Sequence, residues 1–163
     1  MTKTSDTGKK ISYEQTIDMP LAKFDINPFI VDTNDNIVLA QRITTVQYGG
    51  TWHMPGGKVF VDELVLDALK RMSLLKTGLE IEFLCPSLNE SVVGVYDDPN
   101  RDPREHVLGI TFACKILGGE FIPGGNCNDV KAFSPEKALE LQLAFGHDYM
   151  IKDGVKFLKS RRF

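Results

Sequence analysis

The chain has 163 residues, of which 42% are hydrophobic and 25% are charged, a balance typical of one globular domain with its own core. The formal net charge is −3, and the one basic cluster, Lys159, Arg161 and Arg162, lies at the end of the sequence. Nucleic-acid backbones and anionic membranes attract clustered Lys and Arg, so we expect neither as a partner. No apolar run is long enough to span a bilayer, and residues 1–10 lack the apolar stretch of a signal peptide.

The three cysteines, Cys85, Cys114 and Cys127, are widely spaced and include no Cys-x-x-Cys pair. A structural zinc site or a disulfide framework is therefore not expected. We expect reduced thiols in a cytoplasmic protein, with Cys114 facing the core.

Residues 1–20 are rich in Thr, Ser, Lys and Asp and predict a flexible N-terminal arm, followed by a single domain over residues 21–163. Two apolar runs, residues 28–31 and 37–42, flank a turn of Asp and Asn residues, which predicts a β-hairpin. A short strand should follow near Trp52 and break at the Pro-Gly-Gly bend of residues 55–57.

Residues 62 to about 77 predict a helix, because apolar side chains recur at the spacing of one buried face. The positions on that face are Val65, Ala68, Leu69, Met72 and then Leu75 or Lys76. Gly78 follows where a C-capping glycine is usual.

The second half of the chain predicts strands over residues 91–96 and 107–117, a polar loop between them, and a further strand that ends at Phe133. Ser134 and Pro135 suit the N-cap and first position of a helix, and a last helix should cover residues 147–159. This order favours an α/β fold with a mixed β-sheet between helices.

Three motifs carry a resemblance to a known family. The spacing of the Nudix box is matched by Gly57, Glu63 after five intervening residues, Arg71 after seven more, and then Gly78-Leu79. The Trp-x-x-Pro-Gly-Gly segment that usually precedes this box is also present. Residues 98–104 resemble the DPxRDPR loop of the ADP-ribose pyrophosphatase branch, and residues 143–147 resemble its LAFDH segment. The chain is therefore identified as similar to the Nudix (MutT-like) hydrolase superfamily. The resemblance implies the Nudix α/β/α sandwich and a homodimer.

The resemblance also shows what the chain lacks. The family's helix reads R-E-U-x-E-E and supplies carboxylates to Mg²⁺ or Mn²⁺, whereas residues 71–76 read Arg-Met-Ser-Leu-Leu-Lys. Leu75 offers no lone pair, and Lys76 places a positive charge where an ion would sit. The Gly-Gly-Asn-Cys-Asn turn of residues 124–128 resembles a G-G-D-D-A turn without its aspartates. Metal binding is therefore expected to be weak or absent.

Glu63 and Arg71 occupy the remaining catalytic positions of the box. By resemblance to the GDP-mannose hydrolase branch, Glu63 and the carbonyl of Gly57 would hold one metal ion. Alternatively, Glu63 only pairs with Arg71 and braces the loop against the helix, with Arg71 structural. Trp52 could stack on a base, although core packing is the favoured interpretation.

Four cations are predicted to bind substrate. Arg101 and Arg104 either grip phosphate by bidentate contacts or are solvated loop charges, and the motif favours phosphate. Arg42 could meet a ribose or phosphate, and Lys76 is either a surface lysine or a phosphate contact in place of metal. His147 is interpreted as a helix-start histidine rather than a catalyst.

Two functions remain open at this stage. The first is Mg²⁺-assisted hydrolysis of a nucleoside-diphosphate-linked compound resembling ADP-ribose, impaired by the absent glutamates. The second is a catalytically silent Nudix domain that binds such a small-molecule ligand as a sensor. The sequence identifies neither the leaving group nor a general base.

Overall fold

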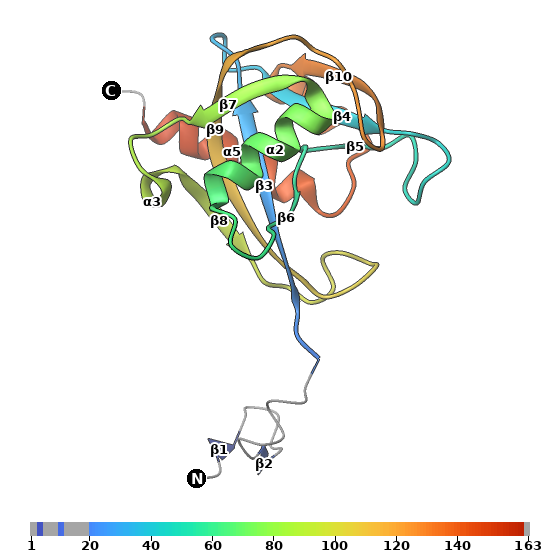
Figure 1. Ribbon diagram of the computed structural model, residues 1–163, viewed down its shortest axis with the longest axis vertical. Helices are drawn as coiled ribbons and strands as arrows, with labels where there is room; N and C mark the ends of the chain where they lie inside the picture. Colours follow the sequence, from blue (N-terminus) through green and yellow to red (C-terminus); the bar gives the residue numbers. More distant parts are fainter. Residues whose placement is uncertain (1–2, 5–9, 12–19, 162–163) are drawn as a thin grey trace.

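The computed structural model describes residues 3–4, 10–11 and 20–161 (Figure 1). Its strands are β1 (Lys3–Thr4), β2 (Lys10–Ile11), β3 (Lys23–Val31), β4 (Ile37–Arg42), β5 (Trp52–His53), β6 (Gly57–Lys58), β7 (Leu79–Phe83), β8 (Val92–Tyr96), β9 (Val107–Gly119) and β10 (Cys127–Phe133). Its helices are α2 (Val65–Thr77), α3 (Leu88–Ser91), α4 (Pro135–Glu140) and α5 (His147–Ser160). The expected N-terminal arm lies mostly outside the described residues; within it, β1 and β2 pair antiparallel.

The main sheet is mixed, as the sequence predicts. Its path runs β10-β4-β3-β9-β7, while β5 pairs with β4, β6 with β3, and β8 with β9. The long β3–β9 pair is parallel and the other pairs are antiparallel. The expected hairpin turn is present, with Val31 opposite Ile37 and the Asp32 carboxylate accepting from the amides of Asn34 and Asn36 at 2.8 and 2.9 Å. These bonds fix the turn locally.

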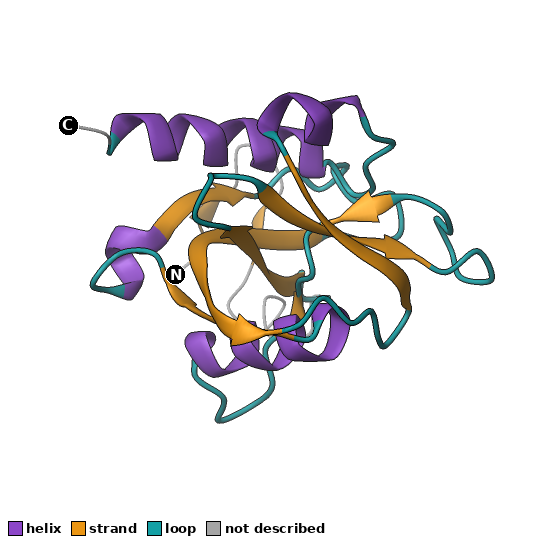
Figure 2. Ribbon diagram, turned by 90° about the horizontal axis from the view of Figure 1, so that it is seen from above, coloured by secondary structure: helices purple, strands orange, loops and turns teal. Residues whose placement is uncertain are grey.

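Helices cover both faces of this sheet, which confirms the α/β/α sandwich (Figure 2). One core cluster lies under α2 and includes Ile26 and Ile30 of β3. The other lies under α4 and α5 and includes Phe29 and Val31. Alternating side chains of β3 therefore enter opposite core layers, and a strand buried on both faces holds the middle of the fold.

Helix α2 differs from its prediction in two respects. It begins at Val65 instead of residue 62, because Asp62 has a left-handed φ of 63° and Leu64 is extended at the N-cap. Its buried residues are Ala68, Leu69, Ser73 and Thr77, so the inward stripe follows i, i+4 steps after Leu69. Leu75 is 52% exposed and does not belong to the buried face. Gly78 caps the helix with a φ of 74°, as expected.

Several single-residue predictions are confirmed. Trp52 packs in the core with 9% exposure, and Cys114 is fully buried. Ser134 accepts the amide of Lys137 at the start of α4, with Pro135 in the first turn. No helix within the described ranges is both long and apolar enough to cross a membrane.

Candidate functional site

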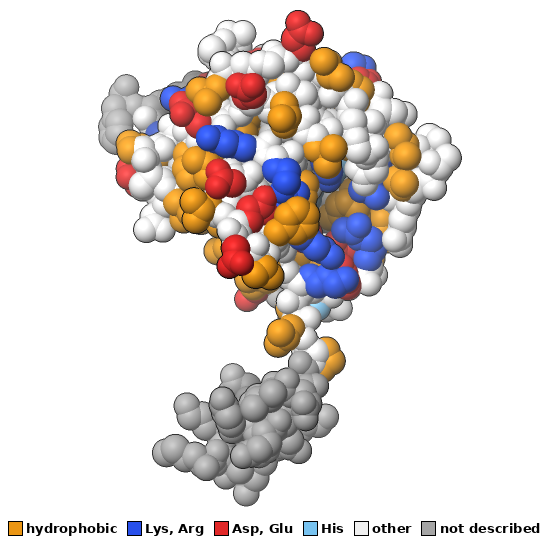
Figure 3. All heavy atoms as spheres, viewed as in Figure 1, with side chains coloured by type: hydrophobic (Ala, Val, Ile, Leu, Met, Phe, Trp, Pro, Cys, Tyr) orange, Lys and Arg blue, Asp and Glu red, His pale blue; other side chains and the backbone are white. Residues whose placement is uncertain are grey.

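A cavity of about 200 Å³ opens where the Pro-Gly-Gly bend, α2 and two loops meet. Five cations line it: Arg42, Lys58, Lys76, Arg101 and Arg104. Figure 3 shows Lys and Arg side chains gathered around this hollow, to the right of centre. Three acids, Asp25, Asp102 and Glu105, also line it, so the cations are in excess. Such a cavity favours an anionic ligand.

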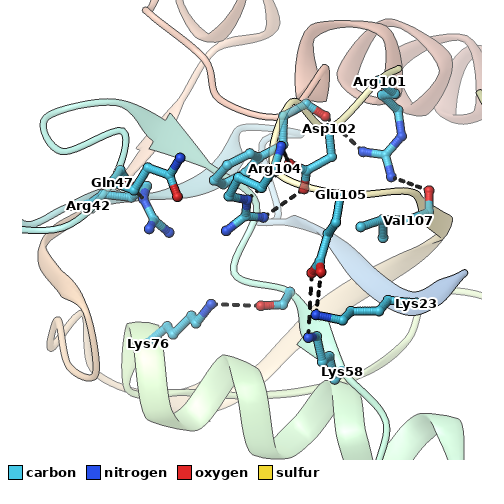
Figure 4. A network of polar contacts seen from close by, with 12 residues as sticks. Lys23, Arg42, Gln47, Lys58, Lys76, Arg101, Asp102, Arg104, Glu105 and Val107 are labelled. Atoms are coloured by element: carbon cyan, nitrogen blue, oxygen red, sulfur yellow. Dashed lines mark hydrogen bonds and ion pairs between the residues drawn. The ribbon is translucent and has the colours of Figure 1, made fainter. Parts of the chain in front are cut away.

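Lys76 reaches the cavity from the last turn of α2. Its ammonium donates to the carbonyl oxygen of Gly56 at 2.7 Å (Figure 4). Burial lowers the pKa of Lys76, and the positive charges of Arg42 and Arg104 add to this shift. An ammonium has three N–H donors, so donors remain for a ligand oxygen. The helix therefore presents a fixed cation beside the Pro-Gly-Gly bend.

Arg42 and Arg104 approach the same space from β4 and from the loop before β9 (Figure 4). Their guanidinium carbons lie 5.2 and 3.9 Å from the ring centroid of Phe145, within the range of cation–π attraction. Arg104 pairs with Asp102 at 2.7 Å, whereas Arg42 donates its Nε to the carbonyl of Gln47 at 2.9 Å. In the described chain Arg42 forms no ion pair, so its charge is available to an anion.

Arg101 also lines the cavity, but most of its hydrogen bonds serve the fold. It donates to the carbonyl oxygens of Phe145 at 2.8 Å and Val107 at 3.1 Å, which ties the polar loop to the segment before α5. Its Nε is buried without a partner among the residues described. Burial lowers the pKa of Arg101, although nearby acids oppose the shift.

Two buried histidines face the cavity as neutral rings. His147 accepts the amide of Met54 through Nδ1 at 2.9 Å, so the neutral ring carries its proton on Nε2. His53 contacts the carbonyl of Ala40 through Nδ1 at 2.9 Å; because a carbonyl only accepts, that nitrogen carries the proton. Burial lowers the pKa of His147 to about 3 and lowers the pKa of His53 well below its usual value. The Nε2 of His53 is left as a buried lone pair without a partner in the described structure.

Glu63 and Arg71 lie outside this cavity lining and hold the 58–63 loop on α2. The Glu63 carboxylate accepts from Arg71 at 2.6 and 2.8 Å and from the Phe60 amide at 2.9 Å. Arg71 also donates to the carbonyl of Lys58, and its guanidinium lies 4.0 Å from the Phe60 ring centroid. This geometry favours the bracing role of the two alternatives. Gly57, by contrast, does line the cavity.

The side chains present do not fit the divalent ion of a Nudix box. Both oxygens of Glu63 are engaged by Arg71, and the Lys76 ammonium contacts the bend at Gly56. Met72 packs beneath the bend, since a Cβ on Gly57 would lie 2.3 Å from its methyl carbon. Among described residues, no group of three or more His, Cys, Asp or Glu could hold a metal ion.

Replacing Glu63 with glutamine should lower the melting temperature at neutral pH and have little effect near pH 2. Hydrogen bonds from Arg71 lower the Glu63 pKa from 4.5 to about 2. A lowered folded-state pKa stabilises the protein above the unfolded value, and this stabilisation is lost as pH falls from about 4.5 towards 2. Thermal melts of both proteins across this range test the prediction. A difference in melting temperature that is independent of pH would contradict it.

Among the cavity residues that the sequence analysis did not predict are one acid and one histidine. Asp25 begins the buried part of β3, and His53 stands inside the Trp-x-x-Pro-Gly-Gly segment. An aspartate directly before a mostly apolar, buried stretch of β3 was the available signal for Asp25. The position of His53 on β5 depends on its pairing with Ala40 of β4, which local pattern does not reveal.

Comparison with known proteins agrees with this architecture. The NUDIX domain family model matches residues 24–154. The chain is 33% identical over 128 residues to the ADP-ribose pyrophosphatase of Methanocaldococcus jannaschii, covering 78% of this chain and 70% of that protein. It is also similar to the crystal structure of an ADP-ribose pyrophosphatase from Streptococcus suis, with a TM-score of 0.65, 26% identity, and coverage of 88% and 94% of the two chains.

A further structural neighbour is the NUDIX domain of Shewanella oneidensis NrtR, whose crystals contain ADP ribose. The TM-score is 0.71 at 18% identity, with 91% of this chain and 99% of that domain covered, so this likeness concerns the fold. Together the family match and the archaeal relative show that this chain belongs to the Nudix family.

Proposed function

We propose that this chain binds a nucleoside-diphosphate-linked compound resembling ADP-ribose and hydrolyses it slowly. The observation that carries the proposal is the convergence of Arg42, Arg104 and Lys76 on one cavity (Figure 4). A diphosphate offers adjacent negatively charged phosphates, which suit cations that approach from different elements. The relatives from M. jannaschii and S. suis, both named ADP-ribose pyrophosphatase, support the choice of ligand class.

In this proposal the Lys76 ammonium takes over much of the charge that divalent ions supply in a complete Nudix box. Mg²⁺ or Mn²⁺ then contributes little to ligand affinity, because the Glu63 carboxylate is held by Arg71. Any ion that does bind should bind weakly. Calorimetry that shows tight binding of two or more Mg²⁺ ions without ligand would contradict this part of the proposal.

Replacing Lys76 with methionine should weaken ADP-ribose binding at least about tenfold, because it removes the ammonium from the cavity and keeps a side chain of similar length. The dissociation constant of wild type for ADP-ribose should agree within about threefold in Mg²⁺ and in EDTA. Isothermal titration calorimetry measures both, and chromatographic product release measures turnover. Lys70→Met is the matched control, since Lys70 is exposed on the same helix. Equal affinity of wild type and Lys76→Met would reject the proposed role of Lys76.

A catalytically silent sensor is the second candidate function. It is favoured by the Lys76–Gly56 contact, which puts an ammonium rather than carboxylates beside the bend. Tight ADP-ribose binding without product release over a day would support the sensor and reject hydrolysis.

We also expect a homodimer in the cytoplasm. Homodimers are implied by resemblance to the ADP-ribose pyrophosphatase branch, and light scattering of the purified chain tests this expectation. A monomer at micromolar concentration would contradict it.

A further inference from the structure

Asp25 is the one cavity acid without an ion-pair partner in the described part of the chain. Asp102 pairs with Arg104, and Glu105 contacts the ammonium groups of Lys23 and Lys58. Asp25 forms no such pair, and its Oδ1 is buried without a hydrogen-bond partner. A buried carboxylate oxygen in this state has lost hydration without gaining a hydrogen bond from the described residues. Asp25 also lines the cavity, so a carboxylate that forms no ion pair within the described chain faces a molecule bound there.

The position of Asp25 is fixed by the sheet. It lies on β3 opposite Lys58 of β6 and beside Gly109 of the parallel strand β9. β6 starts directly after Gly56, whose carbonyl binds the Lys76 ammonium. Asp25 is close enough to Lys76 to oppose the lowering of the Lys76 pKa by burial. The Asp25 carboxylate and the Lys76 ammonium thus line the same cavity.

Burial and the negative charge of Asp102 raise the pKa of Asp25, whereas the positive charges of Lys58, Arg104 and Arg101 oppose this shift. A proton on Asp25 removes a poorly solvated negative charge, so accepting a proton is favoured by its surroundings. His53 is the competing base, with its own unpartnered Nε2. A proton on His53 would add a positive charge to a buried ring beside Lys76 and Arg42; burial and these two positive charges already lower the His53 pKa. Taking up a proton therefore relieves a buried negative charge at Asp25, whereas at His53 it would create a buried positive charge.

We propose that Asp25 is a catalytic residue that accepts the proton of the water molecule attacking the diphosphate. This role rests on the hydrolysis proposed above. One water proton passes to the Asp25 carboxylate while the water oxygen forms a bond to phosphorus. The anhydride P–O bond breaks, and its electron pair stays on the leaving phosphate, whose charge Lys76 and Arg104 stabilise. Asp25 then returns its proton to solvent, and the second water proton leaves from the product phosphate.

The test compares wild type with Asp25→Asn at saturating ADP-ribose. General-base catalysis contributes roughly 10²–10⁴-fold, so kcat should fall at least about 100-fold in Asp25→Asn. The dissociation constant for ADP-ribose should stay within about threefold or become smaller, because the change removes a negative charge from a cationic cavity. Asp67→Asn is the matched control, an exposed aspartate on α2, and its kcat should equal that of wild type.

The pH dependence gives a second readout that a merely structural role would not move. For wild type, kcat should fall on the acid side as Asp25 becomes protonated, and Asp25→Glu should shift that fall while keeping part of the activity. The residual kcat of Asp25→Asn should show no such fall on the acid side. Should Asp25→Asn fail to fold by circular dichroism, the wild-type and Asp25→Glu profiles decide the question.

Each other outcome overturns a specific statement. If folded Asp25→Asn retains more than half of the wild-type kcat, Asp25 is rejected as the base. The same holds if kcat of Asp25→Glu falls at the same acidic pH as kcat of wild type. Parallel loss of binding and turnover makes it a binding residue and also rejects the proposal. ADP-ribose binding by wild type without turnover rejects the catalytic role alone. Absence of any ADP-ribose binding by wild type rejects the proposed function itself.

Discussion

Phe29→Ala is expected to lower the free energy of unfolding by about 3–5 kcal/mol, the largest stability effect among these predictions. Phe29 is fully buried on β3, and its ring lies against the backbone of Gly154 in α5. A Cβ on Gly154 would come within 2.4 Å of that ring, so helix and strand pack with no room for a larger residue. Truncation therefore leaves a cavity that the long α5 helix and the central strand cannot close by a small shift.

Urea unfolding followed by circular dichroism measures this loss for Phe29→Ala. Phe121→Ala is the matched control, because Phe121 is 46% exposed and its truncation should cost about 1 kcal/mol or less. A loss below about 1 kcal/mol for Phe29→Ala would show that the layer under α5 is not closely packed.

Much of this fold could be predicted because its signals are local. The turn after Val31, the glycine cap at Gly78 and the Ser134-Pro135 helix start each depend on a few neighbouring residues. The start of α2 was predicted three residues early, since apolar periodicity gives no sign of the left-handed φ at Asp62 or of the extended backbone at Leu64. The periodicity left the last position of the buried face open between Leu75 and Lys76, and Leu75 is 52% exposed.

The candidate site could be predicted only in part. The four cations predicted to bind substrate, Arg42, Lys76, Arg101 and Arg104, line one cavity, and their contact with a substrate stays a prediction. The sequence left the role of Glu63 open between metal binding and bracing, and the three hydrogen bonds on its carboxylate favour bracing. A role for Asp25 could not be assigned from the sequence. That Asp25 forms no ion pair in the described chain depends on which acids pair with the arginines and lysines of other elements.

Replacing Met72, Leu75 and Lys76 together by glutamate is expected to create Mg²⁺-dependent ADP-ribose hydrolysis well above the wild-type rate. The three positions lie at i, i+3 and i+4 on α2. Met72 and Lys76 contact the Pro-Gly-Gly bend, whereas Leu75 lies beside Gly125. Leu75 is 52% exposed, so its replacement loses little packing. Lys76→Glu removes the ammonium from Gly56 and leaves that carbonyl for a cation. Oxygen ligands clustered in this way suit Mg²⁺.

The triple variant should be less stable than wild type without metal, because three neighbouring carboxylates repel one another. Mg²⁺ at 100 times its dissociation constant should restore about 2.7 kcal/mol, and EDTA should remove both this gain and the activity. Melting curves and calorimetry with Mg²⁺ measure these effects. Lys70→Glu with Leu74→Glu is the matched control, since both residues are exposed on α2 and neither lines the cavity. A folded triple variant that neither binds Mg²⁺ nor hydrolyses ADP-ribose would show that the cavity beyond α2 no longer supports metal-assisted chemistry.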